Sequence, residues 1–265
     1  MRIFLLIFLM FLIGLGQSDL SAQKGVEFGG HIGVAHYFGD LNPDFIVSDP
    51  GFSFGVKFRR NFNERLSISG GVDYGRISGS DSDSNNGFEQ SRNLSFRSDV
   101  LDFNFAFEFN FFPYVHGSDD EYYTPYLFTG FSFMSFNPMA DYEGVTYELR
   151  DFMTEDVDYG LLTPTWFYGI GLKWDYNRDW SFNVNLSGRN AVTDYLDDVS
   201  QNYPSYSGRD AIFTGLANPS SVEGFGQTDT QRGNAGSNDK VFFLTVGAMR
   251  YIGRIHCPPI TKGQY

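Results

Sequence analysis

The sequence predicts an all-β protein, a transmembrane antiparallel up-and-down β-barrel of about eight strands with long extracellular loops and short periplasmic turns. Three observations predict this fold. Apolar and polar residues alternate along several segments, the links between those segments alternate in length, and aromatic residues make up 18% of the chain, with 29 Phe and 16 Tyr. The lipid-facing wall and the interfacial girdles of a barrel need such aromatic residues.

The clearest alternation lies in residues 101–111. Leu101 and the phenylalanines at every second position after it share one face, and Asp102, Asn104, Ala106, Glu108 and Asn110 share the other. A helix would scatter these phenylalanines around its circumference, so the period of two predicts a strand. A soluble sandwich could also use one such strand.

The pattern recurs along the chain. It is clear in residues 26–35, 52–59, 66–75, 166–175 and 180–187. Two more segments, at about 125–136 and 240–252, are apolar on both faces, so their register stays open. The total is eight, an even number, and each segment has about the length of a tilted membrane strand.

The links between these segments give an independent indication. Long links at about 39–50, 78–93, 137–164 and 190–239 alternate with short ones at 61–64 and 177–179, and with an intermediate one at 113–124. Outer-membrane barrels place long loops outside the cell and tight turns in the periplasm. A soluble sandwich has no reason to sort its links in this way.

The N-terminus predicts export. Arg2, an apolar run from Ile3 to Leu15 and the small residue Ala22 are typical of a signal peptide over residues 1–22, cut before Gln23. We therefore expect a barrel over residues 23–252 in the cell outer membrane, followed by a tail over residues 253–265. The tail holds the single cysteine, Cys257, which we interpret as a free thiol because no second cysteine can pair with it.

Composition narrows the functional classes. The net charge of −13 and the lack of a basic stripe argue against nucleic acid as a partner. The mean hydropathy of −0.26 would fit a soluble protein, but the aromatic content disagrees. We expect no cofactor and no small-molecule substrate.

The polar faces of the strands predict what fills the barrel. They carry charges of both signs: Glu27, Lys57, Arg59, Asp73, Asp102, Glu108, Lys173 and Asp175. Eight strands enclose a space that side chains just fill, so these charges are expected to form a ladder of ion pairs that leaves no water channel. A barrel without a pore is expected to anchor, adhere or scaffold.

Three blocks of sequence carry a resemblance to a known family. They are Tyr37 to Pro43, Thr193 to Ser200, and Arg232-Gly233-Asn234 followed by Asn238-Asp239 and Phe242-Phe243. Together, and in this order over nearly the whole mature chain, they resemble the PorG-type outer-membrane barrels of the type IX secretion system of Bacteroidetes.

The resemblance implies a structural component and not an enzyme. Such a barrel would tie a periplasmic ring, made of a lipoprotein and its companion of the PorK and PorN type, to the outer membrane, and would support protein secretion and gliding motility. The alternative is an adhesin-like or general envelope-stabilising barrel whose surface loops bind external ligands.

Two acidic clusters are the weak candidate sites. Asp194, Asp197 and Asp198 could bind a divalent cation if they lie on a helical turn, but they could equally cap a turn or pair with Arg189 or Arg209, and a structural role is favoured. The run Asp119-Asp120-Glu121, in the intermediate link, could meet a basic partner surface, although a solvated run is favoured.

A third acidic segment only partly resembles a calcium loop. Asp81 to Gly87 begins like one, but its sixth position holds Asn86 in place of Gly and its twelfth holds Arg92 in place of Glu. We therefore interpret this segment as a solvated surface loop.

His31 is the one candidate for catalysis. It shares the polar face of its strand with Glu27, and Ser67 and Ser69 lie on another inward face, so a hydrolase triad is conceivable. A polar plug of paired side chains is favoured, and no catalytic residue is assigned.

Overall fold

The computed structural model describes residues 25–43 and 50–253. The predicted signal peptide over residues 1–22 and the tail with Cys257 lie outside the described residues.

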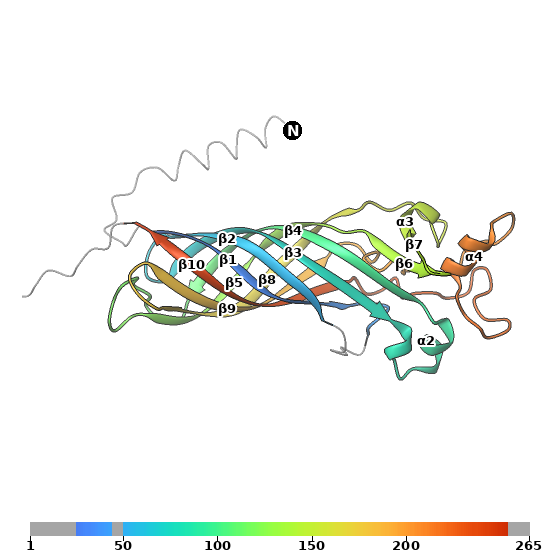
Figure 1. Cartoon of the computed structure of the whole chain (residues 1–265), viewed down its shortest axis with the longest axis horizontal. Helices are drawn as coiled ribbons and strands as arrows, with labels where there is room; N and C mark the ends of the chain where they lie inside the picture. The colour runs from blue at the N-terminus through green and yellow to red at the C-terminus, as the bar shows by residue number, and fades with distance from the viewer. Residues whose placement is uncertain (1–24, 44–49, 254–265) are drawn as a thin grey trace, which may run out of the picture.

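Eight strands wind into one closed antiparallel barrel (Figure 1). They are β1 (Val26–Phe38), β2 (Gly51–Asn61), β3 (Leu66–Ser80), β4 (Ser95–Asn110), β5 (Tyr123–Ser135), β8 (Leu162–Asp175), β9 (Trp180–Ala191) and β10 (Lys240–Ile252). Each pairs with its neighbours in the chain, and β1 pairs with β10 to close the sheet. The predicted fold class is therefore confirmed.

The strands bury their polar face and expose their apolar face. On β4, Phe103 is 52% exposed and Phe107 is 57% exposed, whereas Asp102 is completely buried. This is the reverse of a soluble sandwich, which packs its phenylalanines inward.

The structure fixes the two registers that the sequence left open. On β5, Tyr126 and Phe128 point inward while Leu127 points outward. On β10, Phe243 is buried and Leu244 is 51% exposed. Both faces are apolar because the barrel interior holds aromatic side chains as well as charges.

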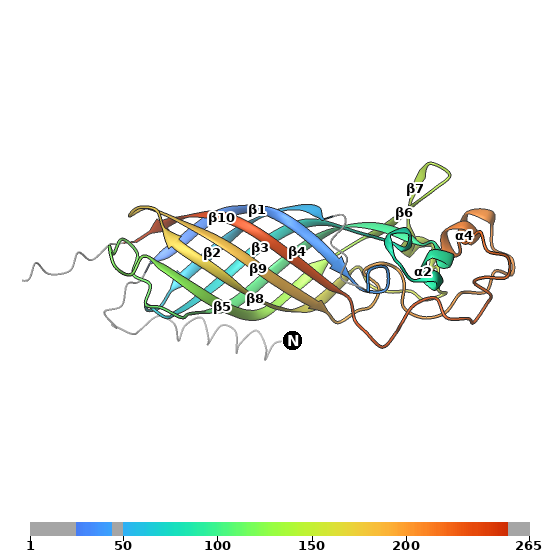
Figure 2. The same ribbon diagram turned by 90° about the horizontal axis from the view of Figure 1, so that it is seen from below.

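The links sort by length between the two ends of the barrel. The turns β2–β3 and β8–β9, the link β4–β5 and the described chain ends Gly25 and Gly253 lie at one end (Figures 1 and 2). The long links lie at the other end and carry η1 (Asp81–Asp83), α2 (Gly87–Arg92), α3 (Leu149–Phe152), α4 (Ala211–Ala217) and the hairpin of β6 (Pro138–Tyr142) and β7 (Val145–Glu148). The predicted alternation is confirmed.

The long links fold into a layer with its own apolar core, which we call the cap: residues 39–43, 81–94, 136–161 and 192–239. Leu94, Leu196 and Leu216 of the cap are buried together with Tyr37 and Phe243 from the strand ends. The longest link is therefore ordered, with α4 inside it. In the part of the chain described, no helix has the length and apolar character needed to cross a membrane.

Candidate functional site

The interior at the short-turn end holds a network of buried charges. Glu108 accepts from Arg59 Nε at 2.7 Å and from Lys57 Nζ at 2.9 Å, and Lys173 Nζ lies 3.3 Å from the same carboxylate. Arg59 Nη1 also donates to Glu27 at 2.9 Å. Charges this deeply buried persist only when they are paired, and here each carboxylate meets at least one cation.

A second network lies nearer the cap. Arg189 bridges Asp73 and Asp102, with Nε 2.8 Å from the Asp102 carboxylate. Asp73 also meets His31 Nε2 at 2.8 Å. The predicted ladder of ion pairs is confirmed, and His31 contributes to it.

Arg189 is the interior residue that the sequence analysis misplaced. We followed the alternation of this strand only as far as Ser187 and considered Arg189 as a possible partner of the acidic cluster after it. The strand β9 continues to Ala191, and the period of two carries Arg189 inward after Asn185 and Ser187. Extending the alternation by two residues would have found it.

The interior is a packed polar core and has little free space. Arg59, Arg189, Tyr126 and Lys173 are among the largest fully buried side chains. A cavity of about 20 Å³ remains beside His31, which is room for about one water molecule.

The link between β4 and β5 folds beneath the short-turn end. His116 Nδ1 lies 2.8 Å from Asp175 and its ring stacks on Tyr251, with the centroids 4.2 Å apart. Tyr114 also donates to Asp175. These contacts hold Asp119 and Asp120 at the surface of this end, with Glu121 half-buried beside them.

Two buried arginines organise the cap. Arg92 forms a two-point ion pair with Asp81, at 2.8 and 2.7 Å, and donates to the carbonyl of Arg232 at 2.6 Å. Arg232 donates to Glu155 at 3.0 Å and to the Asp198 carbonyl at 2.6 Å. Most of residues 81–87 are exposed, as expected of a surface loop. Its first residue, Asp81, is buried, and Arg92, at the position of the missing calcium ligand, neutralises it.

Carboxylates gather between the cap and the first strand. Tyr37 OH lies 2.6 Å from Asp197 and 2.9 Å from Asp239, and it donates to this pair. Burial, together with the charge of the other carboxylate, raises the pKa of Asp197 well above its usual range, and burial with the nearby Asp194 does the same for Asp239. Burial and the neighbouring Asp40 raise the pKa of Asp194 to about 7.

The three aspartates of the first acidic cluster do not share one helical face, because residues 193–200 form no helix. Asp197 accepts from the backbone of Val199 at 2.9 Å, so the turn-capping alternative is confirmed for that residue. Asp198 faces away toward Tyr159, whose hydroxyl lies at 2.6 Å, and burial raises the Asp198 pKa to about 6. Residues 25–43 and 50–253 contain no group of three His, Cys, Asp or Glu arranged to hold a metal ion.

The two arginines expected near this cluster pair elsewhere. Arg189 lies inside the barrel, and Arg209 Nη2 contacts Asp156 at 2.5 Å in the cap. Both pairings with the cluster are therefore wrong, since each guanidinium already faces another carboxylate.

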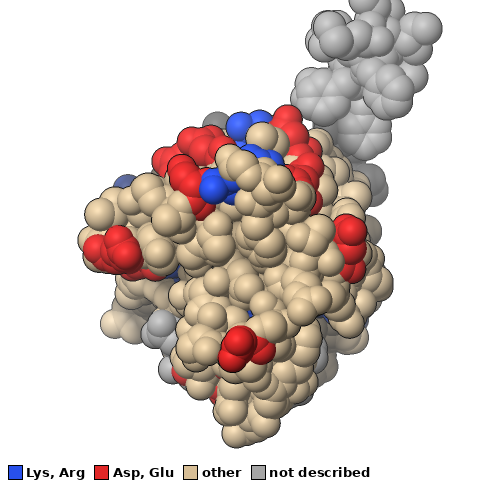
Figure 3. Space-filling view, turned by 90° about the vertical axis from the view of Figure 1, so that its right-hand side faces the viewer, with Lys and Arg blue, Asp and Glu red and all other residues tan. Residues whose placement is uncertain are grey.

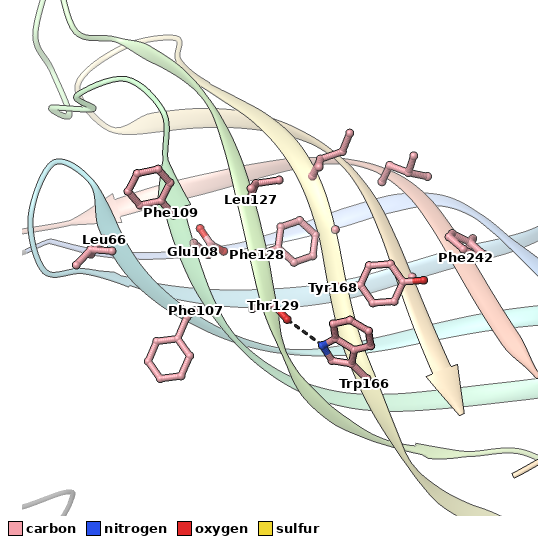
Figure 4. Close-up of a pocket in the computed structure, with 14 residues that line it drawn as sticks. Leu66, Phe107, Glu108, Phe109, Leu127, Phe128, Thr129, Trp166, Tyr168 and Phe242 are labelled. Carbon is pink, nitrogen blue, oxygen red and sulfur yellow. Dashed lines mark hydrogen bonds between the residues drawn. The ribbon is translucent and has the colours of Figure 1, made fainter. Parts of the chain in front are cut away.

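The outer wall carries a shallow apolar groove of about 770 Å³ (Figure 4). Outward side chains of six strands line it, among them Leu66, Phe109, Leu127, Trp166, Tyr168 and Phe242. One hydrogen bond joins two residues of the groove to each other: Trp166 Nε1 donates to the Thr129 hydroxyl at 2.9 Å. Alternation predicts which side chains face outward, but the groove depends on how six strands align.

The family described as Domain of unknown function (DUF6089) matches residues 1–214. No curated protein matches the sequence.

The solved structures that resemble the chain include the following three. The attachment invasion locus protein Ail of Yersinia pestis, solved with a heparin analogue, is 11% identical, with 88% of this chain and 100% of that one covered and a TM-score of 0.42. Neisserial surface protein A is 10% identical, with coverages of 85% and 96% and a TM-score of 0.42. The outer membrane protein OprG from Pseudomonas aeruginosa is 10% identical, with coverages of 89% and 100% and a TM-score of 0.42.

Proposed function

The chain belongs to the family described as Domain of unknown function (DUF6089), and from this premise we propose that it is an integral outer-membrane barrel that acts as a structural anchor. One observation carries the proposal: a closed sheet turns its apolar face outward and fills its interior with paired charges. A protein built in this way needs hydrocarbon around it and offers its two ends for contacts.

The apolar wall supports membrane insertion. Large apolar side chains on every barrel strand are about half exposed, for example Ile32, Phe54, Phe107, Phe131, Ile170, Leu186 and Val246. A water-soluble monomer does not expose so wide an apolar surface, whereas the lipid-facing band of a barrel requires one. Exposed Phe111, Tyr123 and Trp180 at the short-turn end suit the aromatic girdle of the membrane interface.

The interior supports an anchoring role over transport or catalysis. Paired charges and aromatic rings occupy the space that a diffusion pore would need. His31 faces Asp73 and lines a cavity that holds about one water molecule, which leaves little space for a substrate. What the barrel offers to other molecules is its surface.

The short-turn end suits a periplasmic partner. The resemblance to PorG-type barrels implies a ring of the PorK and PorN type, and Asp119, Asp120 and Glu121 are the residues we propose to meet it. Tyr114 and His116 both contact Asp175, and these contacts hold the link that carries the acidic run in one conformation. The partner therefore does not have to order this link when it binds. A preformed acidic surface favours a basic partner by charge complementarity. In this role the barrel would support type IX secretion and gliding.

The test is copurification after mild detergent extraction. The variant Asp119→Asn, Asp120→Asn, Glu121→Gln should recover about tenfold less ring protein, because three charge pairs of about 0.5 kcal/mol each are lost. The matched control neutralises three exposed cap residues, Glu143→Gln, Glu148→Gln and Glu223→Gln, and should recover the normal amount. Equal recovery from both variants would remove the acidic run from the interface.

The adhesin-like alternative has one observation in its favour, the ordered cap. Viewed end-on, the cap is mostly uncharged, with acidic residues in separate places (Figure 3). If the barrel brings down no periplasmic protein while cells carrying it bind external ligands through the cap, the anchor proposal fails and the adhesin replaces it.

A further inference from the structure

The register of the sheet explains the groove on the outer wall. One row of paired outward residues runs from Leu66 through Phe109, Leu127 and Ile170 to Leu186. The next row runs from Phe107 through Thr129, Tyr168 and Gly188 to Phe242. The groove lies along these two rows.

Small residues in the second row form the floor of the groove. Thr129 is the shortest outward side chain of that part of β5, and Gly188 has none. A Cβ at Gly188 would lie 2.8 Å from the Tyr168 ring and 3.1 Å from the Phe242 ring, so glycine lets both rings lean across it. Taller side chains, such as Leu127 and Trp166, stand around this floor (Figure 4).

The groove runs obliquely between the two ends of the barrel. Leu66 is the first residue of β3, at the short-turn end, and Phe242 lies near the start of β10, beside the cap. Because barrel strands tilt from the axis, a row perpendicular to the strands climbs across the membrane. A long, flexible apolar chain fits such a path.

Two exposed arginines stand at the short-turn end of the groove. Arg65 precedes Leu66, and its Nη1 donates to the carbonyl of Phe111 at 2.5 Å. Arg60 on β2 is paired across the sheet with Ile68 on β3, and Ile68 is paired with Phe107 of the groove. The Arg60 guanidinium carbon lies 5.8 Å from the centroid of the Phe62 ring. Within the described residues neither guanidinium has an ion pair.

The outward arginines near the cap differ. Arg76 is paired with Asp99 at 2.8 Å, and Arg97 with Asp141 at 3.3 Å. The free positive charge beside the groove is therefore at the end that faces the periplasm.

We propose that the groove and these two arginines form a binding site for a diacyl glycerophospholipid of the inner leaflet. An acyl chain lies along the groove and the phosphate meets Arg60 and Arg65. The volume of about 770 Å³ lies within the roughly 300–1,000 Å³ of ligand pockets. The inference rests on the proposed insertion in the outer membrane, which sets the leaflet.

The test counts lipids retained by the full chain. The folded barrel, freed of lipid in mild detergent, is titrated with dipalmitoyl phosphatidylglycerol and analysed by native mass spectrometry. One lipid should be retained more strongly than the rest. Free glycerol phosphate should not displace it, because the acyl chain contributes to binding; displacement would mean an anion site alone and would overturn the proposal.

Variants of the groove and of the two arginines test each part of the proposed site. Leu186→Trp narrows the groove and should weaken retention about tenfold, the equivalent of roughly two lost methylene contacts. Val56→Trp, on β2 outside the groove, is the control, since Val56 is 46% exposed and Leu186 is 45% exposed. Arg60→Ser with Arg65→Ser should also weaken retention, whereas Arg250→Ser, at the same end on β10, should not.

The failure of this inference is separable from that of the proposed function. Folding is checked first by the shift of unheated protein on electrophoresis. If the barrel inserts in bilayers but Leu186→Trp and Val56→Trp weaken lipid retention equally, the lipid site is refuted. The proposed anchoring function is unaffected by that result. A chain that never inserts refutes the anchor.

Discussion

The barrel interior and the junction of the cap with the first strand both bury carboxylates, but they balance the charge of these groups differently. Inside the barrel, Glu108 faces Arg59, Lys57 and Lys173. At the junction of the cap and the first strand, Asp197 and Asp239 converge on one tyrosine hydroxyl.

The difference shows two solutions to one problem. A buried carboxylate is stabilised by a cation, as in the interior, or by holding a proton, as at the junction of the cap and the first strand. The carboxylates of the cap should therefore respond to mild changes of pH.

The largest expected effect comes from removing a cation of the interior. Arg59→Met leaves Glu27 and Glu108 buried with fewer partners and should lower the free energy of unfolding by about 3–5 kcal/mol. Urea titration of the protein folded into lipid vesicles measures it. Arg250→Met, on the outward face of β10, is the control and should change stability by less than about 0.5 kcal/mol. Similar losses in both would contradict the inward placement of Arg59.

The second largest expected effect concerns the outward, apolar face of the barrel strands. Phe105→Arg places a charge among lipid chains and should cost about 2–4 kcal/mol if it lies near the midplane. Phe105→Leu keeps the surface apolar and should cost about 1 kcal/mol or less. The same vesicle titration distinguishes them, and equal costs would mean that this face does not meet hydrocarbon.

The smallest effect concerns the pH dependence of the cap. The pKa of Asp194 is raised to about 7 and that of Asp198 to about 6, in both cases chiefly by burial. Because a raised pKa means that the folded state holds the proton more tightly, this stabilisation is complete below the usual value of 3.8 and is lost as the pH rises through the folded pKa values. Amides of residues 193–200 should therefore open more often at pH near 8 than near 5, as measured by hydrogen exchange corrected for intrinsic rates.

A variant tests whether Asp197, whose pKa is also raised by burial, contributes to that pH dependence. Asp197→Asn removes the charge and leaves an oxygen for Tyr37, so it should stabilise the cap by about 1–3 kcal/mol at alkaline pH. Asp158→Asn, whose carboxylate is 69% exposed, is the control and should leave exchange unchanged. An unchanged pH profile in Asp197→Asn would mean that this carboxylate does not carry a proton in the folded cap.

Much of the fold was predictable, because a period of two records which side of a sheet each residue faces. The phenylalanines of residues 101–111 and the charges at Glu27, Arg59 and Glu108 were assigned to the correct faces in this way. Arg189 was missed because it lies beyond the point where we ended the alternation. The ion pair of Asp81 with Arg92 was missed, since it depends on a loop shape that no local pattern encodes.

The sequence by itself determined the alternation, the sorting of long and short links and the sign of each inward charge, because these are properties of neighbours along one strand. Only the tertiary structure decided which charges meet, how the cap encloses its carboxylates and where the wall is grooved. Those features join residues far apart in the chain, such as Arg59 with Glu108 and Tyr37 with Asp239, and depend on the register between strands.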